Sequence, residues 1–247
     1  VPSLIALGVM YLTVIYGNTG FLHSFNTTLA AWPIWTWVIV LLGYSYVASV
    51  LPVWTLLQPR DYINSLQLIS ALALILLGLA AAAFIGYTPN GSEKQTLQMV
   101  APAWDFNPKN APVIFPFLFI TIACGAVSGF HCLVSSGTSS KQLKNETDAR
   151  FVGYGSMLTE GFLATLVIIA CGAGLGLGLA IKDGSILTGQ AAWAAQYGDW
   201  TAAGALAAKV GAFVQGSANF LQALGLSGPV SIAMMGVLVA SFAGTTL

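Results

Sequence analysis

The sequence predicts an all-α membrane protein, built as a polytopic bundle of transmembrane helices. Of its 247 residues, 57% are apolar and only 6% are charged, whereas soluble globular domains carry about 25% charged residues. A chain with so few charges cannot cover a globule of this size with a solvated surface, so lipid must be the solvent for much of it. The formal net charge is zero. This argues against a nucleic-acid partner, which requires a basic surface.

Long apolar runs locate the predicted spans, because a helix needs about 20 apolar residues to cross a hydrocarbon core. The second run is entered through Trp32 and Trp35, aromatic residues typical of the membrane interface. The third is the clearest, since residues 68–85 carry no charge. A further stretch, 206–226, contains several polar side chains and is expected to be a re-entrant or interfacial helix, or a span that faces the protein interior. The six predicted spans are 4–21, 35–57, 66–87, 113–134, 157–181 and 230–247.

The charged residues lie almost entirely between these runs and predict an orientation. The short connection after the second span holds Arg60 and Asp61, and the connection after the fourth holds the basic residues between Lys141 and Arg150. The positive-inside rule gives most weight to short loops, so both connections are expected in the cytoplasm. The Arg60–Asp61 pair is interpreted as an interfacial cap rather than a gate, because exposed ion pairs are weak.

One stretch of the fourth predicted span is too polar and too rich in glycine for a regular helix in lipid. It begins at Gly125 and continues into a run of serines at 135–140. Non-helical backbone at membrane depth is tolerated only where it lines a cavity or is buried in protein, and transporters form substrate sites where helices are interrupted. Hydroxyl groups here could satisfy the freed backbone groups. We therefore expect a substrate-binding site made of Ser128, Gly129, His131, Ser135 and Thr138.

Two ionisable residues near this break are predicted to couple transport to protons. An ionisable group at membrane depth is costly and usually functional, and the imidazole of His131 titrates near neutral pH. The alternative for His131 is an interfacial side chain that caps a carbonyl. Glu160 lies one turn inside the fifth predicted span, where desolvation would favour a protonated carboxyl. The alternative for Glu160 is a carboxylate stabilised by the dipole at a helix N-terminus.

Other motifs argue against an enzyme. The glycines at 172–178 lack the spacing of a nucleotide-binding loop and instead form two overlapping G-x-x-x-G pairs, which are typical of close helix packing in membranes. Cys124, His131 and Cys132 do not converge on an ideal helix and are too few for a zinc site. Ser128 near His131 has neither a G-x-S-x-G elbow nor an acid to orient the base. We expect no catalysis, no cofactor and no metal.

Three segments resemble the carbon starvation protein A family of bacterial inner-membrane transporters. They are LPVWTLLQPRDYINS at 51–65, SGFHCLVSSGTSSKQLKNETDARFVGYGSMLTEG at 128–161 and VASFAGTTL at 239–247. The second is long and specific, and the order of the hydrophobic runs fits over essentially the whole chain. One departure is Cys132, where the family is expected to carry a small residue or proline. The chain opens and closes inside apolar runs, so it is expected to be an internal fragment of a longer transporter.

This resemblance implies a proton-coupled secondary transporter used in the response to carbon starvation. It implies peptides or small carboxylates such as pyruvate as substrates, and an inverted-repeat fold of the amino acid–polyamine–cation type. It also implies a multi-pass location in the bacterial inner membrane. The expected partners are the lipid bilayer, a small-molecule substrate, protons and the rest of the transporter chain. A channel or passive facilitator, and a transporter-like nutrient sensor, are the alternatives.

Overall fold

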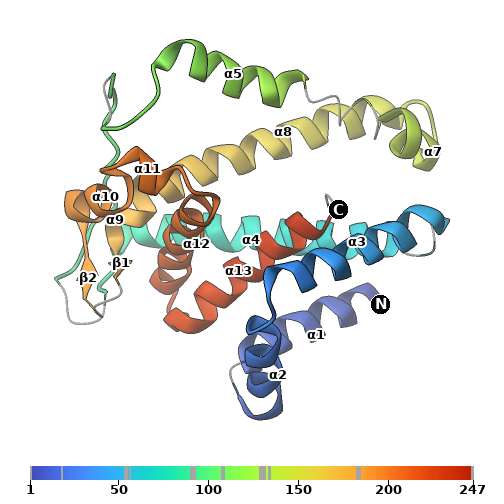
Figure 1. Ribbon diagram of the computed structural model, residues 1–247, viewed down its shortest axis with the longest axis horizontal. Coiled ribbons are helices and arrows are strands. Elements are labelled where there is room, and N and C mark those ends of the chain that lie inside the picture. The colour runs from blue at the N-terminus through green and yellow to red at the C-terminus, as the bar shows by residue number, and fades with distance from the viewer. Residues whose placement is uncertain are drawn as a thin grey trace.

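A computed structural model describes residues 2–17, 19–52, 55, 57–89, 93–106, 109–127, 132, 135–181 and 185–245. Nearly all regular structure in these ranges is helical (Figure 1), which confirms the predicted all-α class. The helices are α1 (Pro2–Tyr16), α2 (Gly20–Ala30), α3 (Ile34–Val50), α4 (Leu57–Phe84), α5 (Ile114–Val127), α7 (Ser140–Gln142), α8 (Asp148–Ile169), α9 (Leu175–Leu177), α10 (Gly189–Tyr197), α11 (Trp200–Ala203), α12 (Leu206–Ala223) and α13 (Gly228–Thr245). Two π-helical segments are η1 (Ser135–Ser139) and η2 (Ala170–Gly174), and strands β1 (Leu179–Ala180) and β2 (Ile186–Leu187) pair antiparallel.

Two helices of the described chain are long and apolar enough to cross a membrane. They are Pro59–Phe84 and Asp148–Leu177, the second formed by α8, η2 and α9 in succession. Both begin several residues before the apolar runs predicted at 66–87 and 157–181, so the prediction that Arg60 lies in a loop is wrong. The helices extend into the polar sequence because proline is tolerated in a first turn and an aspartate is favoured there. Figure 1 shows the N-terminal ends of α4 and α8 at the same end of the molecule.

The stretch predicted as a first span at 4–21 is divided into α1 and α2, which are bent by 84°. Gly20 has a φ of 49°, in the left-handed region that glycine adopts without strain. Polar side chains satisfy backbone carbonyls at the bend: Asn26 donates to the Gly17 oxygen at 3.0 Å, and Thr19 donates to the Tyr16 oxygen at 2.7 Å. The bent pair therefore makes up either one broken span or a re-entrant loop.

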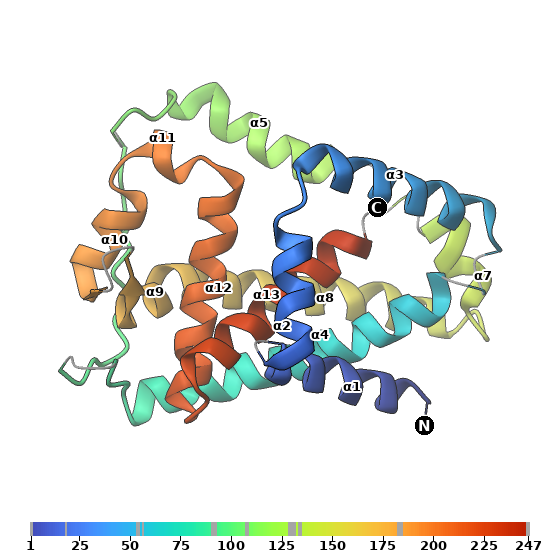
Figure 2. The same cartoon turned by 60° about the horizontal axis from the view of Figure 1, so that its bottom comes forward.

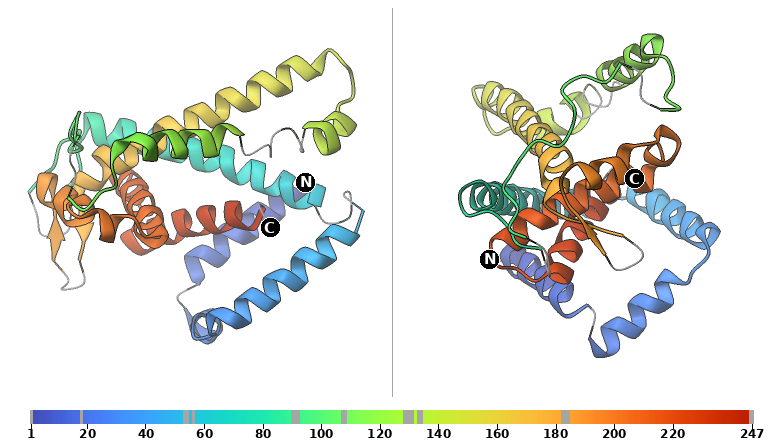
Figure 3. Two further views of the ribbon diagram at one scale, coloured as in Figure 1. Left: turned by 45° about the horizontal axis from the view of Figure 1, so that its top comes forward. Right: turned by 90° about the vertical axis from the view of Figure 1, so that its left-hand side faces the viewer.

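The remaining apolar helices are shorter than a full span. They are Ile34–Val50, Ile114–Ala123 and Gly228–Ser241. In that order, they overlap the spans predicted at 35–57, 113–134 and 230–247. Figure 3 shows α2 and α3 at the periphery of the molecule, away from α12. That these shorter helices cross a membrane stays a prediction.

Helix α12 lies in the interior, packed against α4, α13 and η2 (Figure 2). Its Phe220 and Leu221 are fully buried in a cluster with Ile75 of α4 and Met235 of α13. The fit is close, because a side chain at Gly78 would collide with the backbone of Phe220. Of the alternatives predicted for 206–226, the structure therefore favours a helix that faces the protein interior.

The glycine-rich segment packs closely, as its spacing predicts, but against two different neighbours. A Cβ atom at Gly174 would lie 2.6 Å from the carbonyl oxygen of Gly216 in α12, so this glycine makes the predicted helix–helix contact. Gly172 and Gly176 instead adjoin an extended segment, where a Cβ would meet Met99 and Val100 respectively. The Val100 amide donates to the Gly172 oxygen at 2.8 Å. The segment therefore joins the long span to the connection between α4 and α5.

Candidate functional site

The predicted break lies between α5 and α8. Helix α5 is described as far as Val127, Cys132 is helical, and π-helix η1 runs from Ser135 to Ser139. Ser128, Gly129 and His131, the first part of the predicted substrate site, lie outside the described residues. Two other members of that site, Ser135 and Thr138, fall within η1.

Helix α8 and the η1–α7 segment enclose a groove of about 810 Å³. Ser135 and Glu160 both line it, so two of the predicted site residues share one groove although they come from separate elements. Apolar side chains make up most of the remaining wall. The lining residues are Ser135, Ser139, Ser140, Leu143, Ala149, Val152, Gly153, Ser156, Met157 and Glu160.

Three of the serines in the groove donate their hydroxyl protons to backbone carbonyls. They can therefore act toward a ligand only as hydrogen-bond acceptors. The hydroxyl of Ser135 donates to the Cys132 oxygen at 3.0 Å, that of Ser140 to the Ser136 oxygen at 2.9 Å, and that of Ser156 to the Val152 oxygen at 2.8 Å. A serine hydroxyl has a single proton and two lone pairs. With its proton engaged by the backbone, each of these serines is left as an acceptor facing the groove.

Glu160 is in the middle of a helix rather than at its beginning. Helix α8 begins at Asp148, more than three turns before Glu160 at about 3.6 residues per turn. The helix dipole acts within the first turn. The alternative explanation of Glu160 as a carboxylate stabilised at a helix N-terminus is therefore wrong, because the apolar run from which it was inferred begins later than the helix does.

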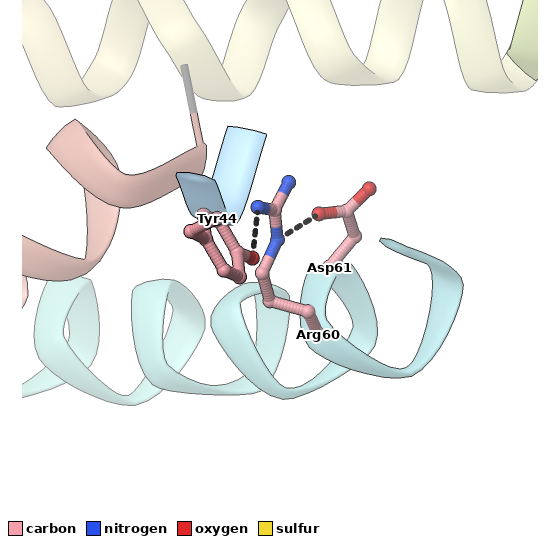
Figure 4. Close-up of polar contacts among 3 residues, drawn as sticks. All are labelled: Tyr44, Arg60 and Asp61. Carbon is pink, nitrogen blue, oxygen red and sulfur yellow. Dashed lines mark hydrogen bonds and ion pairs between the residues drawn. The ribbon is translucent and has the colours of Figure 1, made fainter. Parts of the chain in front are cut away.

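Arg60 links α4 to α3 (Figure 4). It lies near the start of α4, at the end of the molecule where α8 also begins (Figure 1). Its Nη1 donates to the hydroxyl of Tyr44 at 2.9 Å, and its Nε lies 3.3 Å from an Asp61 carboxylate oxygen. The arginine side chain is mostly buried, whereas that of Asp61 is more than half exposed. The contact with Tyr44 was not predicted, because no local pattern indicates which residue of a neighbouring helix a side chain will meet.

A pair of amides on α12 holds the C-terminal end of the long span Asp148–Leu177, and the sequence did not predict this role. Asn219, only 1% exposed, donates to the carbonyl oxygens of Gly174 at 2.8 Å and Gly178 at 2.7 Å. Gln215 donates to the Asn219 side-chain oxygen at 3.2 Å and to Gly178 at 3.4 Å. These bonds satisfy carbonyls at the end of η2 and α9, where the helix stops inside the protein.

Asp199 fastens the connection before α5 to the short helix α11. One of its carboxylate oxygens accepts from the Thr201 amide at 2.9 Å and from the Thr201 hydroxyl at 2.6 Å, and the other accepts from Asn110 at 3.0 Å. These hydrogen bonds, chiefly those from Thr201, lower the pKa of Asp199 below its usual value, because they favour the charged form. Within the described ranges, no three His, Cys, Asp or Glu side chains group as metal ligands would.

Comparison with known proteins gives one consistent result. The family model described as "Carbon starvation protein CstA" matches residues 1–246. The "Peptide transporter CstA" of Campylobacter jejuni is 40% identical over 201 residues, which make up 76% of this chain and 26% of that protein. The "Pyruvate/proton symporter BtsT" of Escherichia coli K12 is 47% identical over 135 residues, and the "Peptide transporter CstA" of the same strain is 46% identical over 144. Each of these two matches covers 55% of this chain and 18% of the relative.

The chain thus spans about a quarter or less of the length of these relatives. All three bear the names of transporters rather than enzymes. No solved structure matches the chain.

Proposed function

The chain belongs to the carbon starvation protein CstA family, and on that premise we propose that it forms part of a proton-coupled peptide transporter of the bacterial inner membrane. The observation that carries the proposal is the groove between α8 and the η1–α7 segment. It combines a carboxyl group, Glu160, with a π-helical segment that begins at Ser135. Such local departures from the α-helix occur frequently at functional sites, and ionisable groups at membrane depth mark substrate and ion pathways.

The chemistry of the groove favours a substrate that donates hydrogen bonds. Ser135, Ser140 and Ser156 present acceptors, Glu160 adds a carboxyl group, and the described lining includes no Lys or Arg. The ammonium and amide N–H groups of a peptide are donors, whereas a free carboxylate needs donors around it. The groove volume of about 810 Å³ lies within the range of about 300–1,000 Å³ typical of small-molecule sites, which suits a short peptide.

A small carboxylate such as pyruvate is the second candidate substrate. It is supported by the likeness to the relative named a pyruvate/proton symporter. The positive groups that it requires would have to come from outside the described lining of the groove.

Glu160 is proposed to carry the coupling proton, with His131 as a second proton-coupling residue. A carboxyl group can bind a proton from one side of the membrane and release it to the other when the groove changes its access. Ser128, Gly129 and Thr138 are proposed to complete the substrate site with His131 and Ser135. Protons and substrate would then be moved together, in the nutrient uptake that the family name associates with carbon starvation.

The test uses the full-length transporter that contains this chain, reconstituted in liposomes under an imposed pH gradient. Glu160→Gln is expected to abolish uphill uptake of a labelled dipeptide while exchange between equal concentrations persists. The matched control is Glu146→Gln, the same substitution in the connection before α8, which is expected to leave uptake unchanged. Unchanged proton-driven uptake by Glu160→Gln would remove this residue from the mechanism.

The same assay separates the alternative functions. A channel or facilitator would equilibrate the dipeptide without accumulating it, even with the wild-type protein and a pH gradient. A sensor would bind the dipeptide without any flux. Pyruvate in place of the dipeptide tests the second substrate.

A further inference from the structure

Helix α8 has a second concave face on the side opposite the groove. This hollow of about 600 Å³ is lined by Thr147, Arg150, Phe151, Tyr154, Gly155 and Leu158. Successive helix residues are separated by about 100°, so Leu158 points about 200° away from Ser156 of the groove. All the lining residues belong to α8 or immediately precede it, so no other element of the described part of the chain lines the hollow.

The side chains of this face are those that membrane helices turn toward lipid. Phe151 is 82% exposed, Tyr154 62% and Leu158 69%. Helix–helix contacts within membranes favour small residues, and α8 places Ala149, Gly153 and Ser156 on the groove side, whereas Gly155 is the one glycine of the hollow. The opposite face, with its large apolar groups, is therefore better suited to acyl chains than to another helix.

A positive charge lies at the N-terminal end of the strip formed by Phe151, Tyr154 and Leu158. Arg150 is in the first turn of α8 and takes part in no ion pair within the described part of the chain. Asp148 lies two residues before it, about 200° around the helix, and so points away. A guanidinium group binds phosphate through two parallel hydrogen bonds, and the hydroxyl of Thr147 is a further donor in the same hollow.

We propose that this face of α8 binds an anionic phospholipid. Arg150 and Thr147 hold the phosphate, and an acyl chain lies along Phe151, Tyr154 and Leu158. Aromatic and basic residues gather where membrane helices meet the headgroups, and basic residues at that level attract anionic lipids. The preceding segment holds Lys141, Lys144 and Glu146, so it adds one net positive charge at this end of the helix.

The proposal does not depend on the transported substrate. A lipid bound here contacts the same helix that carries Glu160 on its other side, so it stabilises the position of α8. Anionic lipid is therefore expected to raise the thermal stability of the protein more than a neutral lipid with identical chains.

The experiment measures the melting temperature of the full-length protein in detergent during titration with phosphatidylglycerol or phosphatidylcholine of the same acyl chains. Native mass spectrometry counts the bound lipids. The wild-type protein is expected to prefer phosphatidylglycerol, and Arg150→Gln to weaken that binding about fivefold, as expected for one basic residue at an anionic surface. Arg150→Lys is expected to retain part of the preference, because it keeps the charge without the paired hydrogen bonds.

Two controls keep the result specific. Lys209→Gln removes one positive charge from α12 and is expected to leave the lipid preference unchanged. Glycerol 3-phosphate, which has the anionic group without acyl chains, is expected to give no stabilisation. Equal stabilisation of the wild type by both lipids, or an unchanged preference in Arg150→Gln, would overturn the proposal. A full effect of glycerol 3-phosphate would also overturn it, in favour of a site for a soluble phosphate compound.

Discussion

The Asn219→Leu substitution tests whether the amide of α12 anchors the C-terminal end of the long span. Leucine is similar in size but cannot donate to the oxygens of Gly174 and Gly178, which lie 2.8 and 2.7 Å from the Asn219 amide nitrogen. The amide of Gly178 cannot take over at Gly174, since it already donates to the Leu175 oxygen. Gln215 can still reach Gly178, at 3.4 Å. One buried carbonyl is therefore orphaned and a second is left with a long bond.

An orphaned buried polar group costs about 1–3 kcal/mol, so the free energy of unfolding should fall by about 2–4 kcal/mol. Unfolding in mixed micelles, followed by tryptophan fluorescence, measures this change. The control is Asn26→Leu, the same substitution where the amide makes one hydrogen bond on an exposed side chain, and its expected loss is about 1 kcal/mol or less. A loss below about 0.5 kcal/mol for Asn219→Leu would refute the reasoning, because the two carbonyls would then have found other partners.

Three further predictions concern the packing of α12, the contact of Asp199 with the connection before α5, and the α3–α4 contact. Gly216→Ala should destabilise the protein by about 1–3 kcal/mol, because its Cβ would collide with the Ala170 backbone. In contrast, Gly211→Ala, at an open position of the same helix, should stabilise by about 0.5–1 kcal/mol; thermal unfolding compares the two. The lowered pKa of Asp199 implies a stabilisation that is present above about pH 4 and lost as the pH falls through the folded-state pKa. Asp199→Asn should weaken this acid dependence, measured by hydrogen exchange of α11 between pH 5 and 2.5. Tyr44→Phe removes the hydroxyl that joins α3 to α4 and should speed hydrogen exchange in α3 while leaving α12 unchanged; equal rates in α3 would contradict that role.

Local properties of the sequence account for the predictions that succeeded. The low charge content predicted a membrane protein. The long, specific segment 128–161 indicated the family, which the comparisons confirm. The glycine spacing predicted close packing, which is confirmed at Gly174. In each case, the property depends on composition or on neighbours within a few turns.

The predictions that failed or fell short involve the ends of elements. Apolar runs mark where lipid surrounds a helix, not where the helix begins. Helices α4 and α8 therefore start earlier than predicted, and Glu160 is about two and a half turns deeper in its helix than predicted. The 84° bend between α1 and α2 was missed because the predicted span 4–21 was extended through the polar residues 17–20. The bend includes Gly20 in a left-handed backbone conformation, which hydropathy does not report.

The sequence by itself determined that the protein is suited to a lipid environment, that it is helical and to which family it belongs. Each of these follows from which residues are present and in what order. Only the tertiary structure decided that Ser135 and Glu160 share a groove, that Asn219 holds the end of the span, and that Arg60 meets Tyr44. These pairings join residues that are distant in sequence, and their geometry is set by how the helices pack. A polar side chain in an apolar run indicates that a partner is needed, but the packing of the helices chooses that partner.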